Sequence, residues 1–359
     1  MSDIPNMYFL EEDLRNKKDI ALFLGSGINL GGPNGNTLSW DNLLKELFTT
    51  AINIRFPNII EKYKKKKKYK KKKYKKNKEK EEEIINELRR DFPVEIQAKI
   101  VKQVLMDGYI PIIQDFLYHK VTKDVLIESL KYCYKNESNF SNDNFSTKLN
   151  NNFFSLYCLA KIILINPNIK VVVTYNYDNF LTQAVNILKD IFSKTHNDIP
   201  IRDVSIRDVS YLDESDGPKE NEILVYHVHG YIPPFSEPLP INGSHIVLTM
   251  DEVCEETMSV YSWQTSTQLH FLNHYVCLCA GLSFRGLNER RMFFYSNKNG
   301  NKERIYFLDA GKDKEINNFS LEEDGFTLLF SEKDFIHLYT KLLNTFKNYP
   351  KTQDKKWKN

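Results

Sequence analysis

Four short polar segments of this chain contain residue types that bind phosphate, hold an amide or transfer a proton. These segments are Gly25–Asn29, Thr174–Asp178, His227–Gly230 and Gly281–Ser283. Each one lies at the end of an apolar run that predicts a buried strand. Because ligands of open α/β sheets bind beyond the carboxyl ends of the strands, the four segments together predict one binding site.

Gly25-Ser26-Gly27 follows the apolar run Ile20–Leu24. Glycines in this position let the backbone turn tightly and approach a pyrophosphate, with amide N–H groups as donors. The dinucleotide-binding fingerprint would place a third glycine at position 30, where this chain has Leu30. Any turn from a strand into a helix can also use glycine, so the motif alone leaves phosphate binding and a simple turn both open.

Thr174–Asp178 comes directly after the apolar residues 171–173. If the strand continues, its alternation places Thr174, Asn176 and Asp178 on one side. An amide and a carboxylate that point into a cleft could hold a carboxamide, a ribose hydroxyl or a water molecule. The alternative is that Asn176 or Asp178 only caps the following helix.

His227 and His229 end a third apolar run, beside Gly230. Alternation places both imidazoles on one face of the strand, as in a pair of metal ligands. No third Cys, His or acidic ligand lies nearby at a recognisable spacing, so we predict no metal site. A histidine at a strand end could instead be a general base that titrates near neutral pH, and the alternative is a structural histidine.

Gly281 and Ser283 follow the apolar run Tyr275–Ala280, and Asn288 and Arg290-Arg291 come soon after. A serine hydroxyl in a glycine turn suits a ribose or phosphate oxygen. The same residues also fit an ordinary helix start.

The elements that must position these segments alternate between strands and helices. Strands are predicted at Ile20–Leu24, Lys170–Thr174, Ile223–Val228, His245–Thr249, Tyr275–Ala280, Ile305–Asp309 and Phe326–Phe330. Helices are predicted at about 39–54, 79–90, 93–107, 110–119, 123–134, 151–165, 178–192, 287–295 and 331–347, with long loops at 136–152 and 195–221. The pattern predicts the α/β class: a Rossmann-like sheet of mostly parallel strands with helices on both faces and a large helical insertion. One domain would span 1–330 with the insertion at about 41–165, and a C-terminal helix and tail would span 331–359.

The formal net charge of +3 is distributed unevenly. Residues 62–80 contain 14 lysines and one glutamate, and the remainder carries 36 basic and 46 acidic residues, a net charge of −10. The basic run could contact nucleic acid or a membrane surface. The favoured interpretation is a low-complexity surface excursion, in keeping with another duplication in the chain, IRDVS at 201–205 and again at 206–210.

The chain has no run of about 18 apolar residues and its first residues do not resemble a signal peptide, so no membrane partner is expected. Five scattered cysteines do not form a disulfide framework. The sequence therefore predicts a cytoplasmic protein.

The order of the four polar segments resembles the sirtuin-like NAD-binding family, and most of all its bacterial branch of NAD hydrolases in anti-phage defence. GSGIN is similar to the opening G-[AS]-G loop of that family, and Leu38-Ser39-Trp40-Asp41 to the P-x-W-x-x-L stretch after it. TYNYD resembles Q-N-x-D, VHG the catalytic H-G, HIVLTMDE the L-T-x-x-[DE] stretch, and GLSF the ribose-side G-x-S. The resemblance covers about 19–310.

The resemblance implies a role for each matching residue. Gly25, Ser26 and Gly27 would cradle the pyrophosphate, and Gly281 and Ser283 would contact the adenosine side. Thr174 is expected to contact the cofactor as well. Asn176 would position the attacking water or the nicotinamide ribose, and Asp178 would hold the carboxamide or orient that asparagine. His229 would be the general base, with His227 as a competitor for that role.

The chain departs from the deacylating sirtuins, which carry a four-cysteine zinc ribbon, because it contains no C-x-x-C. The expectation is therefore an NAD glycohydrolase that uses NAD as substrate without a metal and depletes it in defence. Such an effector implies control through a homo-oligomer or a separate subunit, such as a HerA-like ATPase or a short Argonaute. The alternatives are a zinc-free deacylase or ADP-ribosyltransferase, and a non-catalytic regulator that binds NAD or ADP-ribose.

Overall fold

A computed structural model describes most of the chain. The described residues are 4–31, 38–58, 77–140, 149, 152–195, 201–210, 218–238, 245–259, 262–283, 287–298, 303–310 and 320–349. Most of the lysine-rich run, residues 62–76, lies outside them, as does Phe284 of the GLSF motif.

The core of the molecule is a seven-stranded sheet in which every neighbouring pair of strands is parallel. The strand order is β3-β4-β2-β1-β5-β6-β7. The strands are β1 (Ile20–Leu24), β2 (Ile169–Thr174), β3 (Ser205–Val209), β4 (Glu222–His227), β5 (Val276–Ala280), β6 (Ile305–Ala310) and β7 (Thr327–Ser331). This architecture confirms the predicted Rossmann-like α/β class.

The register of the central strands brings their carboxyl ends to one level. Leu24 of β1 pairs with Thr174 of β2 and with Ala280 of β5, and Thr174 also pairs with His227 of β4. The four polar segments predicted from the sequence therefore leave the sheet side by side at one edge.

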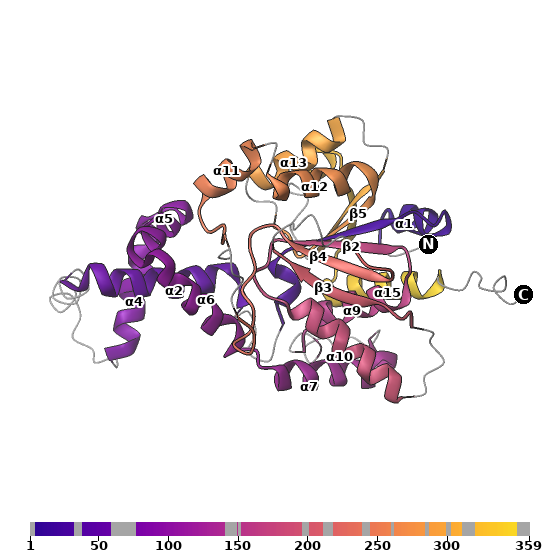
Figure 1. Cartoon of the computed structure of the whole chain (residues 1–359), viewed down its shortest axis with the longest axis horizontal. Coiled ribbons are helices and arrows are strands. Elements are labelled where there is room, and N and C mark those ends of the chain that lie inside the picture. Colours follow the sequence, from indigo (N-terminus) through magenta and orange to yellow (C-terminus); the bar gives the residue numbers. More distant parts are fainter. Residues whose placement is uncertain are drawn as a thin grey trace, which may run out of the picture.

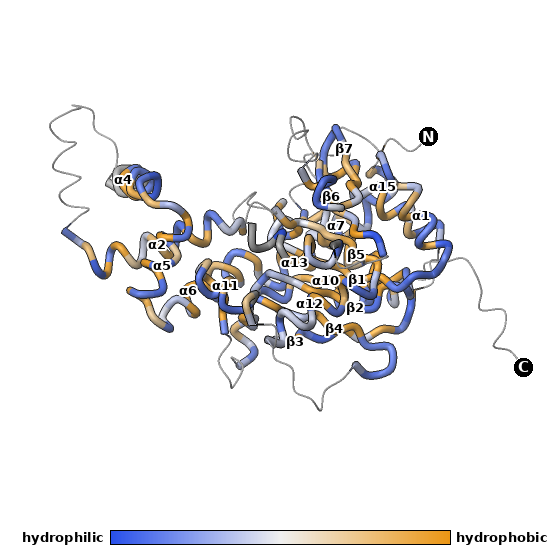
Figure 2. The backbone as a smooth tube through the Cα atoms, turned by 90° about the horizontal axis from the view of Figure 1, so that it is seen from above, coloured by the Kyte–Doolittle hydropathy of each residue, from blue (hydrophilic) through white to orange (hydrophobic). Residues whose placement is uncertain are grey.

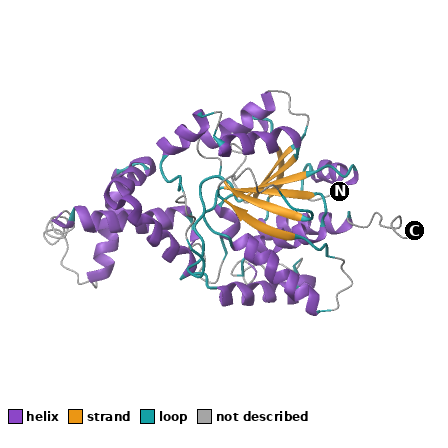
Figure 3. Cartoon of the chain, in the orientation of Figure 1, coloured by secondary structure: helices purple, strands orange, loops and turns teal. Residues whose placement is uncertain are grey.

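Helices cover both faces of the sheet (Figure 1, Figure 3). Alternate residues of β1 belong to two separate cores, with Leu22 and Leu24 on one face and Ala21 and Phe23 on the other. The first face packs against helices α1 (Met7–Arg15), α9 (Phe154–Ile165), α10 (Phe180–Lys194) and α15 (Phe335–Asn348). The second packs against α12 (Trp263–His274) and α13 (Leu287–Lys298). Since both faces are covered, the central strands β1 and β5 are apolar along their whole length.

Residues between β1 and β2 form the predicted helical region. Helices α2 (Trp40–Arg55), α4 (Asn77–Asp91), α5 (Val94–Leu105) and α6 (Tyr109–Tyr118) form a helical arm that projects from one side of the sheet (Figure 1, Figure 2). Short 3₁₀ turns η3 (Met106–Gly108) and η4 (Glu137–Asn139) connect helices of this region. By contrast, α7 (Lys123–Lys135) and α9 pack beside α10 under the sheet.

Two predictions about strands are wrong. The predicted loop 195–221 contains β3, an edge strand whose residues are mostly half-exposed, so it lacks the apolar run of the inner strands. The predicted strand His245–Thr249 is extended but joins no ladder. It lies instead against the loop after β4, where Val247 N donates to His229 O at 3.0 Å and Tyr177 Oη donates to Val247 O at 2.6 Å. A further helix, α11 (Met250–Met258), begins directly after it.

No helix among the described ranges is both long and apolar enough to cross a membrane.

A buried charged cluster joins the C-terminal helix to the centre of the molecule. Eleven of the twelve residues of α9 are buried, including Lys161, whose side chain is only 1% exposed. Its ammonium pairs with Glu137, which also accepts from Tyr157 Oη at 2.7 Å and pairs with Lys347 of α15. Burial lowers the pKa of the Lys161 ammonium, and the neighbouring Glu137 carboxylate opposes this shift.

We expect Glu137→Ala to lower the free energy of unfolding by about 3–5 kcal/mol, because it leaves the Lys161 ammonium buried without its carboxylate. Lys161→Met is the matched control, since Glu137 then still pairs with Lys347 and binds Tyr157. Urea denaturation followed by circular dichroism measures both losses. Equal losses in the two variants would contradict a role for the buried ion pair.

Candidate active site

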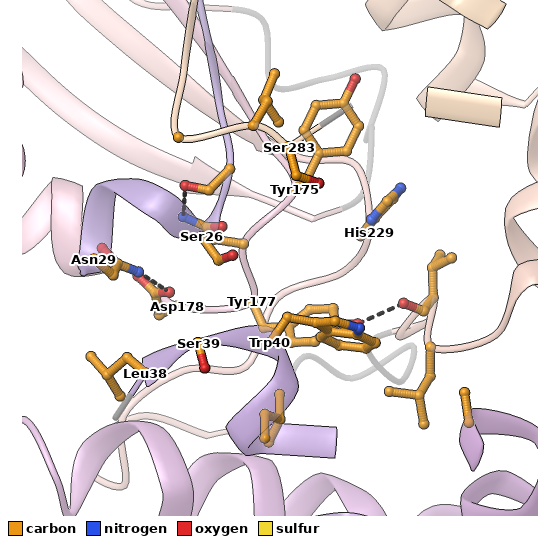
Figure 4. Close-up of a pocket in the computed structure, with 18 of the residues that line it drawn as sticks. Ser26, Asn29, Leu38, Ser39, Trp40, Tyr175, Tyr177, Asp178, His229 and Ser283 are labelled. Carbon is orange, nitrogen blue, oxygen red and sulfur yellow. Dashed lines mark hydrogen bonds between the residues drawn. The ribbon is translucent and has the colours of Figure 1, made fainter. Parts of the chain in front are cut away.

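A cavity of about 280 Å³ lies at the carboxyl ends of the central strands (Figure 4). Its lining includes seven of the nine predicted site residues: Gly25, Ser26, Asn176, Asp178, His229, Gly281 and Ser283. Gly27 and Thr174 are the two predicted residues that do not line it. The structure therefore brings most of the predicted site residues together at one cavity.

Three glycines allow the loop after β1 to contact the loop after β5. Gly25 N donates to Ala280 O at 3.0 Å, and Gly27 N donates to Gly281 O at 2.9 Å. A Cβ atom on Gly27 would lie 2.7 Å from Gly281 Cα, and one on Gly25 would lie 2.6 Å from Gly281 O. Gly281 itself has a φ of +68°, in the left-handed region that favours glycine. Glycine at these positions is explained by this close approach of two backbones, independently of any ligand.

The loop after β2 holds Asn176 in one position. Asn176 is 7% exposed, and its backbone N–H donates to Thr174 Oγ1 at 3.1 Å. Its side-chain Nδ2 donates to Gly25 O at 3.3 Å. Thr174 therefore supports the asparagine from behind the cavity, while Asn176 links the loops after β1 and β2.

Asp178 lies just before α10 and faces the cavity. Its Oδ1 accepts from the backbone N–H of Phe180, the first residue of α10, at 3.1 Å, although the N-cap residue of this helix is Asn179, and its Oδ2 accepts from Asn29 Nδ2 at 2.7 Å. Burial raises the pKa of the Asp178 carboxyl to about 6, although the Phe180 N–H, His227 and Asn29 each lower it. The carboxyl is therefore mostly ionised at neutral pH but close to its titration range.

Asn29 is a site residue whose role the sequence did not reveal. It lies in the 3₁₀ turn η1 (Ser26–Asn29), is 2% exposed and lines the cavity. Its Oδ1 is buried and has no hydrogen-bond partner within the part of the chain that the structure describes. A ligand N–H that entered the cavity would supply the missing donor. Its place within GSGIN was the only sequence signal.

The two histidines at the end of β4 point in different directions, and the prediction from alternation is wrong. The strand ends at His227, and Gly230 with a φ of +95° turns the chain just after His229. Only His229 lines the cavity, with its ring edge-on to Tyr175 at a centroid distance of 4.9 Å. Burial lowers the pKa of His229 to about 4, so its imidazole is neutral at physiological pH and has a lone pair to accept a proton. His227 is fully buried behind the cavity.

The outer wall comes from the helical arm and from α11, and the sequence did not predict that these elements line the cavity. Trp40, at the start of α2, packs edge-on against Tyr177, with 6.2 Å between the two ring centroids. The wall also includes side chains of α2, α5, α6 and α11, namely Leu43, Val94, Glu95, Ala98, Phe116, Leu117, Met250 and Val253. Lys99 of α5 pairs with Asp251 of α11 at 2.7 Å, and Lys102 pairs with Glu252. These ion pairs fasten the arm to the first turn of α11 beside the cavity.

Ser283 is exposed at the rim of the cavity, and the residues that follow it, 284–286, are not described. Arg290, a further candidate, lies elsewhere and donates to Ser320 Oγ at 3.0 Å. The side chains of Asn288 and Arg291 lie outside the described set. Within that set, no group of three or more His, Cys, Asp or Glu side chains is arranged to hold a metal ion.

Comparison with known proteins identifies the fold that carries this cavity. No curated protein matches the chain. Residues 170–345, from β2 to α15, match the family model of the SIR2-like domain. This range carries Asn176 and Asp178, in the loop after β2, and His229, in the loop after β4, and this part of the chain is sirtuin-like.

Proposed function

We propose that this protein is an NAD glycohydrolase, which cleaves NAD with water into nicotinamide and ADP-ribose. SIR2-like domains use NAD, so the substrate class follows from the family. The observation that supports the proposal best is the convergence of Asn176, Asp178 and His229 on one cavity at the carboxyl ends of β2 and β4.

The chemistry needs little covalent help from the protein. The bond between the ribose C1′ and the nicotinamide nitrogen breaks, and nicotinamide leaves as a neutral molecule. Water adds to C1′ and loses a proton, so ADP-ribose gains the hydroxyl. In this proposal Asn176 orients the water or the ribose, and neutral His229 accepts the proton directly or through a ribose hydroxyl. The Asp178 carboxylate would favour the positive charge that develops on the sugar, or hold the carboxamide.

The buried Asn29–Asp178 pair suits the carboxamide of nicotinamide. The free Oδ1 of Asn29 needs a donor, and a carboxamide N–H₂ group carries two. Asp178 Oδ2 already accepts from Asn29, and an ionised carboxylate has capacity for a second donor. Hydrolysis is favoured over deacylation because the chain contains no C-x-x-C element from which a zinc ribbon could be built.

The resemblance to the defence branch also suggests a role for this activity in the cell. The protein would act in the cytoplasm as an effector of anti-phage defence that depletes NAD. Control would come from a homo-oligomer or from a separate activator subunit, such as a HerA-like ATPase or a short Argonaute. The lysine-rich segment 62–80 is the proposed place for any contact with nucleic acid.

We expect Asn176→Ala and His229→Ala each to lower kcat for nicotinamide release by about 100-fold or more, because each removes a group that orients or deprotonates the nucleophile. The measurement is NAD consumption by the full chain, with nicotinamide and ADP-ribose separated by chromatography and no protein acceptor present. His270→Ala is the control, because this histidine is exposed on α12 and does not line the cavity.

Near-normal turnover in both cavity variants would overturn the residue assignment. Release of nicotinamide only with an acylated peptide would identify a deacylase instead. Binding of NAD without cleavage, with and without candidate activator subunits, would identify a regulator.

We expect kcat/KM for NAD cleavage to fall as the pH drops through about 6, because protonation of Asp178 removes the negative charge from the cavity. His229, with a pKa of about 4, stays neutral across this range and adds no second limb. A profile from about pH 5 to about pH 8 measures the effect. Asp178→Asn should be slower and should lack the acidic limb; an unchanged limb in this variant would assign it to another group.

A further inference from the structure

A buried histidine lies directly behind the proposed catalytic loop. His227 is completely buried at the end of β4. Its Nδ1 lies 2.9 Å from the backbone oxygen of Asn176, and its Nε2 lies 2.8 Å from Oδ1 of Asp208 on β3. The ring therefore bridges the edge strand and the loop that carries Asn176.

Both partners of this ring are acceptors. The backbone oxygen of Asn176 has no proton to give, so Nδ1 must donate. Asp208 Oδ1 already accepts from Thr182 Oγ1 of α10 at 2.8 Å, which favours Nε2 as the donor on the other side. A neutral imidazole has only one N–H, so with Nδ1 as a donor the contact between Nε2 and Asp208 Oδ1 needs one further proton, on Nε2 or on the carboxyl. With that proton on Nε2, the pair consists of a buried imidazolium and a carboxylate with no net charge.

The surroundings suit a cation at this position. The ring of Tyr231 packs against His227 at a centroid distance of 4.7 Å, and aromatic faces favour positive charge. The titratable groups near the ring are Asp208 of β3, Asp178 of the Asn176 loop, and the phenols of Tyr231 and Tyr118. Among the influences on Asp178, His227 lowers the pKa of the carboxyl and thus favours its ionised form.

We propose that His227, protonated on both ring nitrogens and held by Asp208, is a positioning residue that fixes the backbone of Asn176 and places a positive charge behind Asp178. The proposal rests on the proposed NAD hydrolysis, for which it names two further residues. Neither residue lines the cavity, so each acts through the loop between β2 and α10. His227 Nδ1 then binds the backbone oxygen of Asn176, and Thr174 Oγ1 binds its backbone N–H.

The protonation state is tested without any turnover. Long-range ¹H–¹⁵N spectra of the imidazoles at about pH 7.5, assigned by difference with His227→Gln, should show both nitrogens of His227 protonated. In Asp208→Asn the amide can donate to Nε2, so a neutral His227 keeps both hydrogen bonds and the spectrum should change to a neutral tautomer. A neutral His227 in the unaltered protein would overturn the proposal.

The positioning role is tested by kinetics. His227→Ala and Asp208→Ala should lower kcat about 10- to 100-fold with little change in KM, because the catalytic loop is displaced while the cavity wall remains. Asp208→Asn should recover much of the kcat, because it restores the hydrogen bond, and should move the acidic limb of Asp178 to higher pH because the cation is lost.

Arg207→Ala is the matched control. Arg207 precedes Asp208 on β3 and pairs with Glu222 of β4 at 2.9 Å, so its loss loosens the same two strands without touching the Asn176 loop. If Arg207→Ala lowered kcat as much as Asp208→Ala, the effect would be general loosening of the edge strand and the proposal would fail.

Failure of the proposed function is distinguishable from failure of this inference. If the unaltered protein cleaves no NAD, the imidazole spectrum still reports the proton on each nitrogen. A crystal structure of His227→Ala then reports whether the Asn176 backbone moves. An unmoved loop would overturn the positioning role whatever the activity.

Discussion

The close contact between the loop after β1 and the loop after β5 is the constraint on which the site depends. It exists because Gly25, Gly27 and Gly281 carry no side chains, and a Cβ atom on any of them would lie within 3 Å of the facing backbone. With the two loops together, Gly25 O becomes available to Asn176 Nδ2, and Asn29 comes within reach of Asp178. The side-chain contacts of the inner wall thus depend on the close approach of the two backbones.

Several side chains of the site have a structural duty as well as a proposed chemical one. Asp178 binds the first backbone N–H of α10 and faces the cavity, and Asn176 joins two loops while it lines the same space. Burial of these groups is unfavourable unless their hydrogen bonds are satisfied, and here nearly all are. The exception is Oδ1 of Asn29, which leaves a polar atom available to a ligand. These hydrogen bonds fix the positions of the side chains independently of a substrate, as orientation of water requires.

Much of the fold was predictable from apolar runs alone. The runs at 20–24, 170–174 and 275–280 are buried on both faces, so their strands were predicted correctly. Strand β3 was missed because an edge strand has fewer apolar neighbours and a more polar sequence. Residues 245–249 have the composition of a strand but bind a loop. Composition does not distinguish a segment that joins a sheet from one that packs against a loop.

The site was predictable where its residues follow strands, and not elsewhere. Alternation failed at His227 and His229 because the turn at Gly230 ends the strand before the second histidine. The arm residues and Asp208 come from segments far apart in the sequence, and only the folded chain brings them to the cavity and its supporting loop. The family match, which begins at residue 170, likewise leaves the arm and the first glycine loop outside.

The central position of β1 has a consequence for how the protein is made. Its residue Ile20 pairs with Ile169 on one side and with Val276 on the other. During synthesis at about 5–20 residues per second, the strand therefore leaves the ribosome many seconds before its second neighbour exists. Until then the apolar strand IALFL can pair with β2 on one edge only, and its other edge has no partner strand, which is a hazard for aggregation. The loop after β5 can pack on the loop after β1 only once β5 has been translated, so the inner wall of the cavity is completed late in synthesis.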